Sequence, residues 1–365
     1  MKRLSLQLAI IVLIGFAMIF SGCGGDSNEG DLYGWAVGSN VDGYGTIIRT
    51  RNGGTTWVRQ GSTVMIPDVP IEDVAAVDSN NVWVVGLNSV GENDLSYGTI
   101  LRTMDGGKRW VRQGSASEIP DVGLSGVSAV DGNAVWVVGS SGTVLHTIDG
   151  GVTWIQQAQG LVPDAEFQMV SAFDRNNVWA VGTKDSNTHA FIIHTTDGGA
   201  TWEMQGENDI PEDVHGLIDV HALNENTVWT VGEGCTALVT RDGGMTWSNK
   251  SPECGLLHVN GVCAVTDQIV WLAVDSNVIF YSTDGGDTWV SQGTSSAEEE
   301  GATVSSALLG VTALNDSTAW IVGSYPIGDS KAIILYTANS GENWGEQTSP
   351  ANSFLRRVSF AGALR

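Results

Sequence analysis

One short phrase, TIDGGVTW at residues 147–154, recurs along the chain and constrains its fold more than any other feature. Seven copies are present, beginning at residues 50, 103, 147, 195, 240, 282 and 337. Their final tryptophans are 53, 44, 48, 45, 42 and 55 residues apart. Self-similarity at a period of about 40–50 residues is typical of repeat proteins in which each unit is one supersecondary element.

Two further phrases repeat in step with the first. One, typified by VWVVG at residues 135–139, precedes every copy and holds the other seven of the fourteen tryptophans. Another, typified by VSAVD at residues 127–131, precedes it in all units but the first. Short β-branched runs such as GTVL at residues 142–145 complete each unit. Each unit therefore predicts four short strands, A to D in order along the sequence, separated by Gly, Asn, Asp and Ser.

Seven such units predict an all-β fold, a seven-bladed β-propeller with four antiparallel strands per blade. An open stack of such units would expose its two ends, whereas a closed ring has no exposed ends. The first unit begins at its B strand, near Tyr33, and the chain ends on an extra A strand over residues 354–360. We expect this last strand to complete the first blade, so that the propeller spans residues 31–365.

The octapeptide resembles the Asp-box, or BNR repeat, of sialidases, sortilins and other propellers. The resemblance implies a C–D hairpin whose Asp accepts hydrogen bonds from the loop and whose Trp packs between blades. We expect this structural role, and no catalytic or metal-binding role, for Asn52, Asp105, Asp149, Asp197, Asp242, Asp284 and Asn339. A Gln three residues after six of the seven box tryptophans is expected to bond backbone groups between blades. The residue before each box is expected to stack on a neighbouring tryptophan.

The N-terminus reads as a targeting signal. Lys2 and Arg3 precede an apolar run from Leu8 to Phe20 that is short for a membrane span. The following Ser-Gly-Cys resembles a bacterial lipobox, which implies lipidation of Cys23 and, without Asp after the cysteine, an outer-membrane location. We therefore expect a lipoprotein signal peptide at 1–22 and a flexible tether at 23–30. The protein would reside in the bacterial cell envelope and touch the membrane through its lipid anchor only.

The charge of the protein limits its partners. Seventeen Lys+Arg against 41 Asp+Glu give a net charge of −24, which disfavours nucleic acids. Antiparallel order places the B–C and D–A loops on one face, here called the loop face, and these loops are acidic. Candidate partner-binding residues there are Asp68, Asp73, Glu92, Asp94, Asp121, Asp164, Glu212 and Asp213. The loop face is either a solvated rim or a docking surface for a basic protein segment, with Ca²⁺ a weaker alternative.

Cysteines and histidines add three expectations. Cys235 lies in a B–C loop and Cys254 in the next D–A loop, so an exported protein would join them in a disulfide. Cys263, in an A strand, is expected to be a buried thiol. His221 replaces a small residue in an A strand and would form, with His215 and His258, at most a weak metal site. We expect neither a bound metal nor a cofactor.

The set of repeats, with the consensus VDxNxVWxVG…GTxLHTxDGGxTWxxQ, is similar to the propeller family of photosystem II stability and assembly factors. The resemblance implies a non-enzymatic protein-binding scaffold, acting here as a monomer on another envelope protein. The arginine patch of photosynthetic members has only a partial counterpart, namely Arg49, Arg51, Arg59, Arg102, Arg109 and Arg112. The alternative is a sialidase-like or other glycoside hydrolase, in which two loop carboxylates would face each other across the channel mouth.

Overall fold

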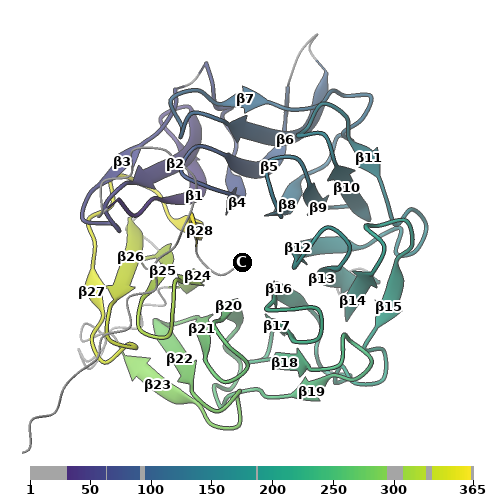
Figure 1. The fold of residues 1–365 in the computed structure, drawn as a ribbon, viewed down its shortest axis with the longest axis vertical. Coiled ribbons are helices and arrows are strands. Elements are labelled where there is room, and N and C mark those ends of the chain that lie inside the picture. The colour runs from purple at the N-terminus through teal and green to yellow at the C-terminus, as the bar shows by residue number, and fades with distance from the viewer. Residues whose placement is uncertain are drawn as a thin grey trace, which may run out of the picture. The chain divides into compact units, whose positions relative to one another are not determined.

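The computed structural model describes residues 31–62, 64–90, 95–185, 188–293, 307–325 and 331–362. Over these residues, seven four-stranded antiparallel sheets form the blades of a ring (Figure 1). This confirms the predicted seven-bladed propeller. Residues 1–30, with the predicted signal peptide, Cys23 and the tether, lie outside the described residues. No helix among the described residues has the length and apolarity that a membrane span requires.

Each blade runs from an inner A strand to an outer D strand, as Figure 1 shows. The first blade is formed by β28 (Leu355–Phe360), β1 (Gly34–Val41), β2 (Tyr44–Thr50) and β3 (Trp57–Arg59). The second is formed by β4 (Ile71–Ala76), β5 (Val82–Val90), β6 (Ser96–Thr103) and β7 (Val111–Arg112). The third is formed by β8 (Leu124–Ala129), β9 (Val135–Gly139), β10 (Thr143–Thr147) and β11 (Ile155–Gln156). The other four are formed by β12 (Glu166–Ala172), β13 (Val178–Lys184), β14 (His189–Thr195), β15 (Glu203–Gln205); β16 (Leu217–Ala222), β17 (Val228–Gly232), β18 (Ala237–Thr240), β19 (Ser248–Asn249); β20 (Val259–Ala264), β21 (Val270–Val274), β22 (Val278–Ser282), β23 (Val290–Gly293); and β24 (Ala307–Ala313), β25 (Ala319–Ser324), β26 (Ala332–Thr337), β27 (Gly345–Glu346).

The ring closes where the first and last strands meet. Strand β28 pairs antiparallel with β1, with Gly34 opposite Phe360 and Ala36 opposite Val358. The Phe360 ring stacks on Trp320 of the seventh blade at 3.9 Å and meets Trp57 of the first blade edge-on at 6.0 Å. The C-terminal strand therefore completes the first blade, as predicted, and also fills its junction with the seventh.

Apolar side chains are buried between neighbouring blades rather than within one continuous core. The B-strand tryptophans are fully buried in all seven blades. At three junctions between described blades the box tryptophan of one blade meets the B-strand tryptophan of the preceding blade edge-on, in the pairs Trp83–Trp154 at 6.0 Å, Trp229–Trp289 at 6.0 Å and Trp271–Trp344 at 5.5 Å. Such aromatic pairs add about 0.5–1.5 kcal/mol each beyond the area they bury. The two tryptophans of the repeat thus hold adjacent blades together.

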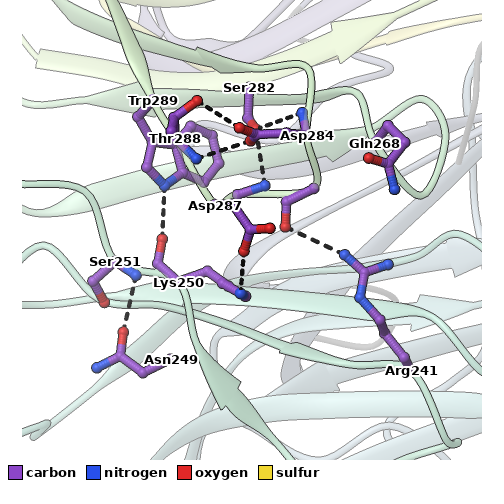
Figure 2. Close-up of polar contacts among 12 residues, drawn as sticks. Arg241, Asn249, Lys250, Ser251, Gln268, Ser282, Asp284, Asp287, Thr288 and Trp289 are labelled. Carbon is purple, nitrogen blue, oxygen red and sulfur yellow. Dashed lines mark hydrogen bonds and ion pairs between the residues drawn. The ribbon is translucent and has the colours of Figure 1, made fainter.

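Each Asp-box closes its own hairpin. In the sixth blade the Asp284 carboxylate accepts hydrogen bonds from the Thr288 N–H at 2.8 Å, the Thr288 hydroxyl at 2.6 Å and the Ser282 hydroxyl at 2.9 Å (Figure 2). These bonds favour the ionised form and lower the pKa of Asp284. Gly285 and Gly286 lie at φ 72° and 86°, where a Cβ would be strained. In the two boxes with Asn, Asn52 and Asn339 each accept the equivalent backbone N–H, at 2.9 and 3.1 Å.

A second set of hydrogen bonds joins neighbouring blades at the box carbonyl, defined here as the backbone C=O that follows the box Asp or Asn. A residue of the preceding blade donates to it at each of the seven junctions. Four donors are glutamines and three are arginines. In ring order, Gln347 donates to Gly53, Arg49 to Gly106, Arg102 to Gly150, Gln157 to Gly198, Gln205 to Gly243, Arg241 to Gly285 and Gln292 to Ser340. Where Lys250 replaces the glutamine, Arg241 supplies the bond and Lys250 pairs with Asp287 at 2.5 Å (Figure 2).

The residue before each box lies opposite the B-strand tryptophan of its own blade, and in several blades the two side chains are in contact. His146 stacks on Trp136 and His194 on Trp179, both with ring centroids 4.0 Å apart. In other blades the stacking residues are Arg102 on Trp83, Tyr281 on Trp271 and Tyr336 on Trp320. Burial lowers the pKa of both His146 and His194 to about 4, so both rings are neutral near pH 7.

Replacing both stacked histidines by phenylalanine is expected to reduce the loss of stability in mild acid. A folded-state pKa near 4, against about 6.5 when unfolded, means that unfolding takes up protons between these values. Each histidine then lowers the free energy of unfolding as the pH falls from about 6.5 to about 4, by up to about 3 kcal/mol. Guanidinium unfolding of wild type and His146→Phe/His194→Phe at pH 7.5 and pH 5 measures this. An equal difference between the two pH values in both proteins would contradict it.

Candidate functional site

The acidic loop face is the first candidate. Five of the predicted partner-binding residues are exposed in D–A loops that join the first five blades in succession: Asp68, Asp121, Asp164, Glu212 and Asp213. Glu92 and Asp94 lie outside the described residues. The described carboxylates are therefore spread along one arc of the loop face, one or two at each junction, rather than gathered at a single point.

Two of these carboxylates also hold the loops in place. Asn40, in the B–C hairpin of the first blade, donates to Asp68 at 2.8 Å, and Asn88 of the second blade donates to Asp121 at 2.6 Å. Hydrogen bonds from Asn88 and Ser96 lower the pKa of Asp121. Asp68 and Asp121 thus fix each D–A loop against the preceding hairpin, while Asp164, Glu212 and Asp213 leave their carboxylates at the surface.

Asp73 does not lie in an exposed D–A loop, so its predicted place on the loop face is wrong. It lies within β4 and is only 5 % exposed. Its carboxylate accepts the N–H groups of Val74 and of Val127 in the next blade, both at 2.8 Å. The strand begins at Ile71, before the acidic pair that reads as loop in the sequence, and a bulge turns Asp73 toward the ring axis.

The same bulge recurs near the start of every inner strand. Pairing skips one residue in β4, β8, β12, β16, β20, β24 and β28, so that two residues oppose one. Bulges re-aim side chains and are frequent beside functional sites. The two residues of each bulge face the central channel. The first of them is the skipped residue, which has no partner on the neighbouring strand, and the seven skipped residues line one hollow of about 200 Å³, here called the mouth. The residues that follow line an inner hollow of about 120 Å³.

Asp73, Asp219 and Arg357 all line the inner hollow of this channel. Asp219 accepts the N–H groups of Val220 at 3.0 Å and of Val262 in the next blade at 2.9 Å, as Asp73 does in its own blade. Burial raises the pKa of Asp73 to about 7 and also raises that of Asp219, and Arg357 partly offsets both shifts. The inner hollow is thus lined by two carboxylates that bridge blades and by one guanidinium.

Arg357 crosses the channel from β28. Its guanidinium donates to the main-chain oxygens of Ile218 at 3.5 Å, Asn260 at 3.0 Å and Leu309, the skipped residues of three other blades. Arg357 lines both the mouth and the inner hollow. Its guanidinium therefore separates the two hollows and ties the C-terminal strand to the fifth, sixth and seventh blades.

The mouth itself does not resemble a glycosidase centre. Its lining is Glu72, Ser125, Gln168, Ile218, Asn260, Leu309, Arg356 and Arg357. Among these described residues Glu72 is the single carboxylate, it pairs with Arg356 at 3.0 Å, and no aromatic ring is present. Two-carboxylate hydrolysis needs a second acid facing the first across the sugar. The arrangement that would favour hydrolysis is therefore not found among the residues lining the mouth.

Cysteines and histidines occupy two settings. Cys235 and Cys254 form a disulfide between the B–C and D–A loops of the fifth blade, with Cα atoms 5.7 Å apart. Cys263 is a free, buried cysteine, and burial raises the pKa of its thiol to about 12. His221 is 6 % exposed in the inner hollow. The described residues contain no group of three or more His, Cys, Asp or Glu side chains placed to hold a metal ion, the His215, His221 and His258 set included.

Most of the N-terminal arginines act within the fold. Arg49 and Arg102 bond box carbonyls, as described above. Arg59 lies over the Tyr44 ring at 4.0 Å and Arg112 over Tyr97 at 3.9 Å, and each also bonds main-chain oxygens of its own blade. These four arginines thus stabilise the first two blades rather than forming a free basic patch.

The comparisons with known proteins agree with the fold. Residues 65–159 and 121–214 match a family model described as Photosynthesis system II assembly factor YCF48. No curated protein matches the sequence. A structure of YCF48 bound to D1 peptide is similar with a TM-score of 0.56 at 20% identity, covering 76% of this protein and 81% of that one. YCF48 from Cyanidioschyzon merolae gives 0.58 at 19% identity, covering 85% and 92%.

Glycoside hydrolases share the fold at lower identity. The GH74 xyloglucanase from Xanthomonas campestris is similar with a TM-score of 0.57 at 11% identity. The match covers 90% of this protein and 54% of that enzyme, so it spans about half of the enzyme's length. Structural likeness at these identities shows the propeller fold alone. The matched segment, residues 65–214, contains the second, third and fourth blades, and these blades are similar to the repeat of the YCF48 assembly-factor family.

Proposed function

We propose that the protein is a non-enzymatic scaffold that binds another envelope protein through its loop face. The match to the YCF48 repeat carries this proposal, because a structure of that protein contains a bound D1 peptide. The closed ring supports it, since a rigid ring of sheets presents the B–C and D–A loops together on one face. Lipidation of Cys23 would hold the protein at a bacterial membrane, on our proposal the outer one, where the ring acts as a monomer.

The chemistry of the loop face favours a basic partner segment. Asp164, Glu212 and Asp213 are exposed carboxylates on successive junctions. Lys184 lines the hollows that Asp164 and Glu212 also line. Complementary charge accelerates association and sets orientation, and its effect weakens as salt screens it. The glycoside hydrolase alternative lacks the facing pair of carboxylates among the mouth residues described above.

Reversing charge on the loop face is expected to abolish partner capture. The variant Asp164→Lys/Glu212→Lys/Asp213→Lys changes three exposed acids of this face. The matched control, Glu225→Lys/Asp316→Lys/Glu342→Lys, makes the same change on the opposite, Asp-box face. Tagged full-length proteins are extracted from membranes, and co-purified proteins are identified by mass spectrometry.

A partner retained by wild type and by the control, but reduced at least tenfold with the loop-face variant, is the expected result. Raising the salt from about 50 mM to about 500 mM is expected to weaken wild-type capture by a similar factor. Partner capture that changes neither with salt nor with the charge of the loop face would contradict the proposed acidic docking surface. Turnover of a glycan panel by the purified protein would instead favour the hydrolase alternative.

A further inference from the structure

Two adjoining hollows lie on the loop face at the outer part of the fourth blade, and together they are called the blade-4 groove here. One, of about 310 Å³, lies against the D–A loop that precedes the blade, with Leu161 and Asp164 in its lining. The other, of about 190 Å³, lies against the D–A loop that follows, with Ile210 and Glu212 in its lining. Lys184, Met204 and Glu207 line both hollows, so the two lie side by side across the blade and share a wall.

The groove combines apolar walls with an acidic rim. Leu161, Met204 and Ile210 are half-buried along it, and Phe191 is fully buried beneath the second hollow. Four carboxylates line its two parts, Asp164, Asp185, Glu207 and Glu212, and all four residues are exposed. Near these four carboxylates lie Lys184 and His189, whose Nδ1 is 3.4 Å from a carboxylate oxygen of Asp185. With histidine neutral the lining has a net charge of −3, from four carboxylates and one lysine.

We propose that the blade-4 groove binds an extended segment of a partner protein in which basic and apolar side chains alternate. Side chains two residues apart on an extended segment point to the same side, about 7 Å apart, which suits two hollows that share a wall. Apolar side chains of the segment enter the two hollows. The intervening lysines or arginines start from the opposite side of the segment, and their long side chains bend back to the carboxylates on the rim. This inference rests on the proposed function and names both the part of the loop face that binds and the chemistry of its ligand.

The charge of the groove selects this occupant over others. An acidic or phosphorylated segment would meet four carboxylates, and a purely apolar one would leave them desolvated without a partner. A strongly basic segment without apolar residues would be attracted to the rim but would leave the walls of Leu161, Met204 and Ile210 uncovered. A segment that supplies both kinds of side chain satisfies the whole lining.

The test uses the full-length protein and three fluorescein-labelled synthetic nonapeptides. One alternates lysine and leucine, the second alternates lysine and serine, and the third alternates glutamate and leucine. Fluorescence anisotropy at low salt gives each dissociation constant. We expect the lysine–leucine peptide to bind at least fivefold more tightly than the lysine–serine peptide, and the glutamate–leucine peptide not to bind. Equal binding of the two lysine peptides would overturn the proposal, because the apolar walls would then play no part.

Matched variants locate the site. The double variant Asp164→Lys/Glu207→Lys reverses charge in the groove, whereas Glu253→Lys on the same loop face and Glu225→Lys on the opposite face reverse it elsewhere. We expect at least a tenfold loss of lysine–leucine binding for the double variant and less than a twofold change for each control. Circular dichroism and thermal melting establish that each variant is folded, and Met204→Ser, which keeps the charge, should weaken the same peptide without affecting lysine–serine binding.

The outcomes separate this inference from the proposed function. Equal losses for the groove variant and for Glu253→Lys would refute the groove and leave a diffuse acidic docking surface intact. If wild type binds none of the peptides while membrane-extracted protein still captures a partner through its loop face, the groove is again refuted and the scaffold stands. If neither experiment shows binding, both fail.

Discussion

A truncated protein that ends at Ser353, and so lacks β28, is expected to lose its cooperative thermal unfolding transition. Leu355, Val358 and Phe360 of this strand are buried, and their removal exposes Trp57 and Trp320 as well as the edge of β1. Burial of three such side chains contributes about 5–8 kcal/mol. Since domains of this kind have a net stability of about 5–15 kcal/mol, the loss approaches the whole of it.

Differential scanning calorimetry and dye binding to exposed apolar surface measure this change. Two comparisons make the result specific to ring closure. Phe360→Leu keeps the strand and should only lower the melting temperature, by about 3–6 °C, given the partial loss of ring packing. A synthetic peptide of residues 354–365 added to the truncated protein should restore a transition. A truncated protein that melts like wild type would show that the first and last blades do not depend on one another.

Replacing Arg357 by methionine is expected to lower the free energy of unfolding by about 2–4 kcal/mol at pH 8, and by less at pH 5. The substitution removes the donor to three main-chain oxygens and the cation that faces two buried carboxylates. Burial already raises the pKa of Asp73 to about 7, so this group lowers stability as the pH rises from about 4 to about 7. Without Arg357 the pKa rises further, and the decline continues to higher pH.

The adjacent arginine provides the control. Arg356→Met makes the same change one residue earlier, at a side chain that is 37% exposed and pairs with Glu72 at the mouth. A partly exposed pair of this kind contributes about 1 kcal/mol or less. Chemical unfolding at pH 5, 6.5 and 8 compares the two variants with wild type. If Arg356→Met and Arg357→Met lower the free energy of unfolding equally at all three pH values, Arg357 does not have the proposed role of joining the C-terminal strand to three blades across the channel.

The repeat phrases were sufficient to predict the blades because their periodicity is imposed by packing. Each unit needs a tryptophan between blades and a turn with a hydroxyl, a carboxylate and two residues at positive φ. The same residue types therefore recur at the same positions of each unit. Strand β28 was predictable for the same reason, since residues 354–360 follow the A-strand pattern while the first unit has none. The predicted closure, the blade number and the strand order therefore follow from local constraints that repeat.

The channel was not predictable in the same way. An unbroken strand turns alternate residues to the axis, so the sequence pattern does not predict two consecutive residues facing the channel. The bulge in each inner strand is what places two consecutive residues there. Asp73 lies in the Pro- and Asp-rich stretch 66–73, which reads as loop, and Arg357 precedes the repeated phrase that begins at Val358. Extending the alignment of the A strands by one residue upstream places Asp73, Asp219 and Arg357 at the position otherwise held by Gly126, Met169, Gly261 and Gly310, which is the signal that would have revealed them.

The blade-4 groove was also beyond the sequence, for a different reason. Its lining comes from two D–A loops, a B–C hairpin and β15, which are distant in sequence and meet only because neighbouring blades are held at a fixed angle. Loop acids such as Asp164 and Glu212 could be nominated individually. Their relation to Leu161, Met204 and Ile210 depends on tertiary geometry that no local pattern records.

The hydrogen bonds between blades end on a box carbonyl, which belongs to the backbone, and this has a consequence for how such rings change over evolutionary time. A backbone acceptor is present whatever the sequence of the incoming repeat, and glutamine or arginine reaches it equally well. A duplicated or exchanged repeat thus finds its neighbour's acceptor already in place, with no need for a second, compensating substitution. Tandem copying can then alter one unit at a time, which leaves the exposed loops free to diverge while the junctions stay interchangeable.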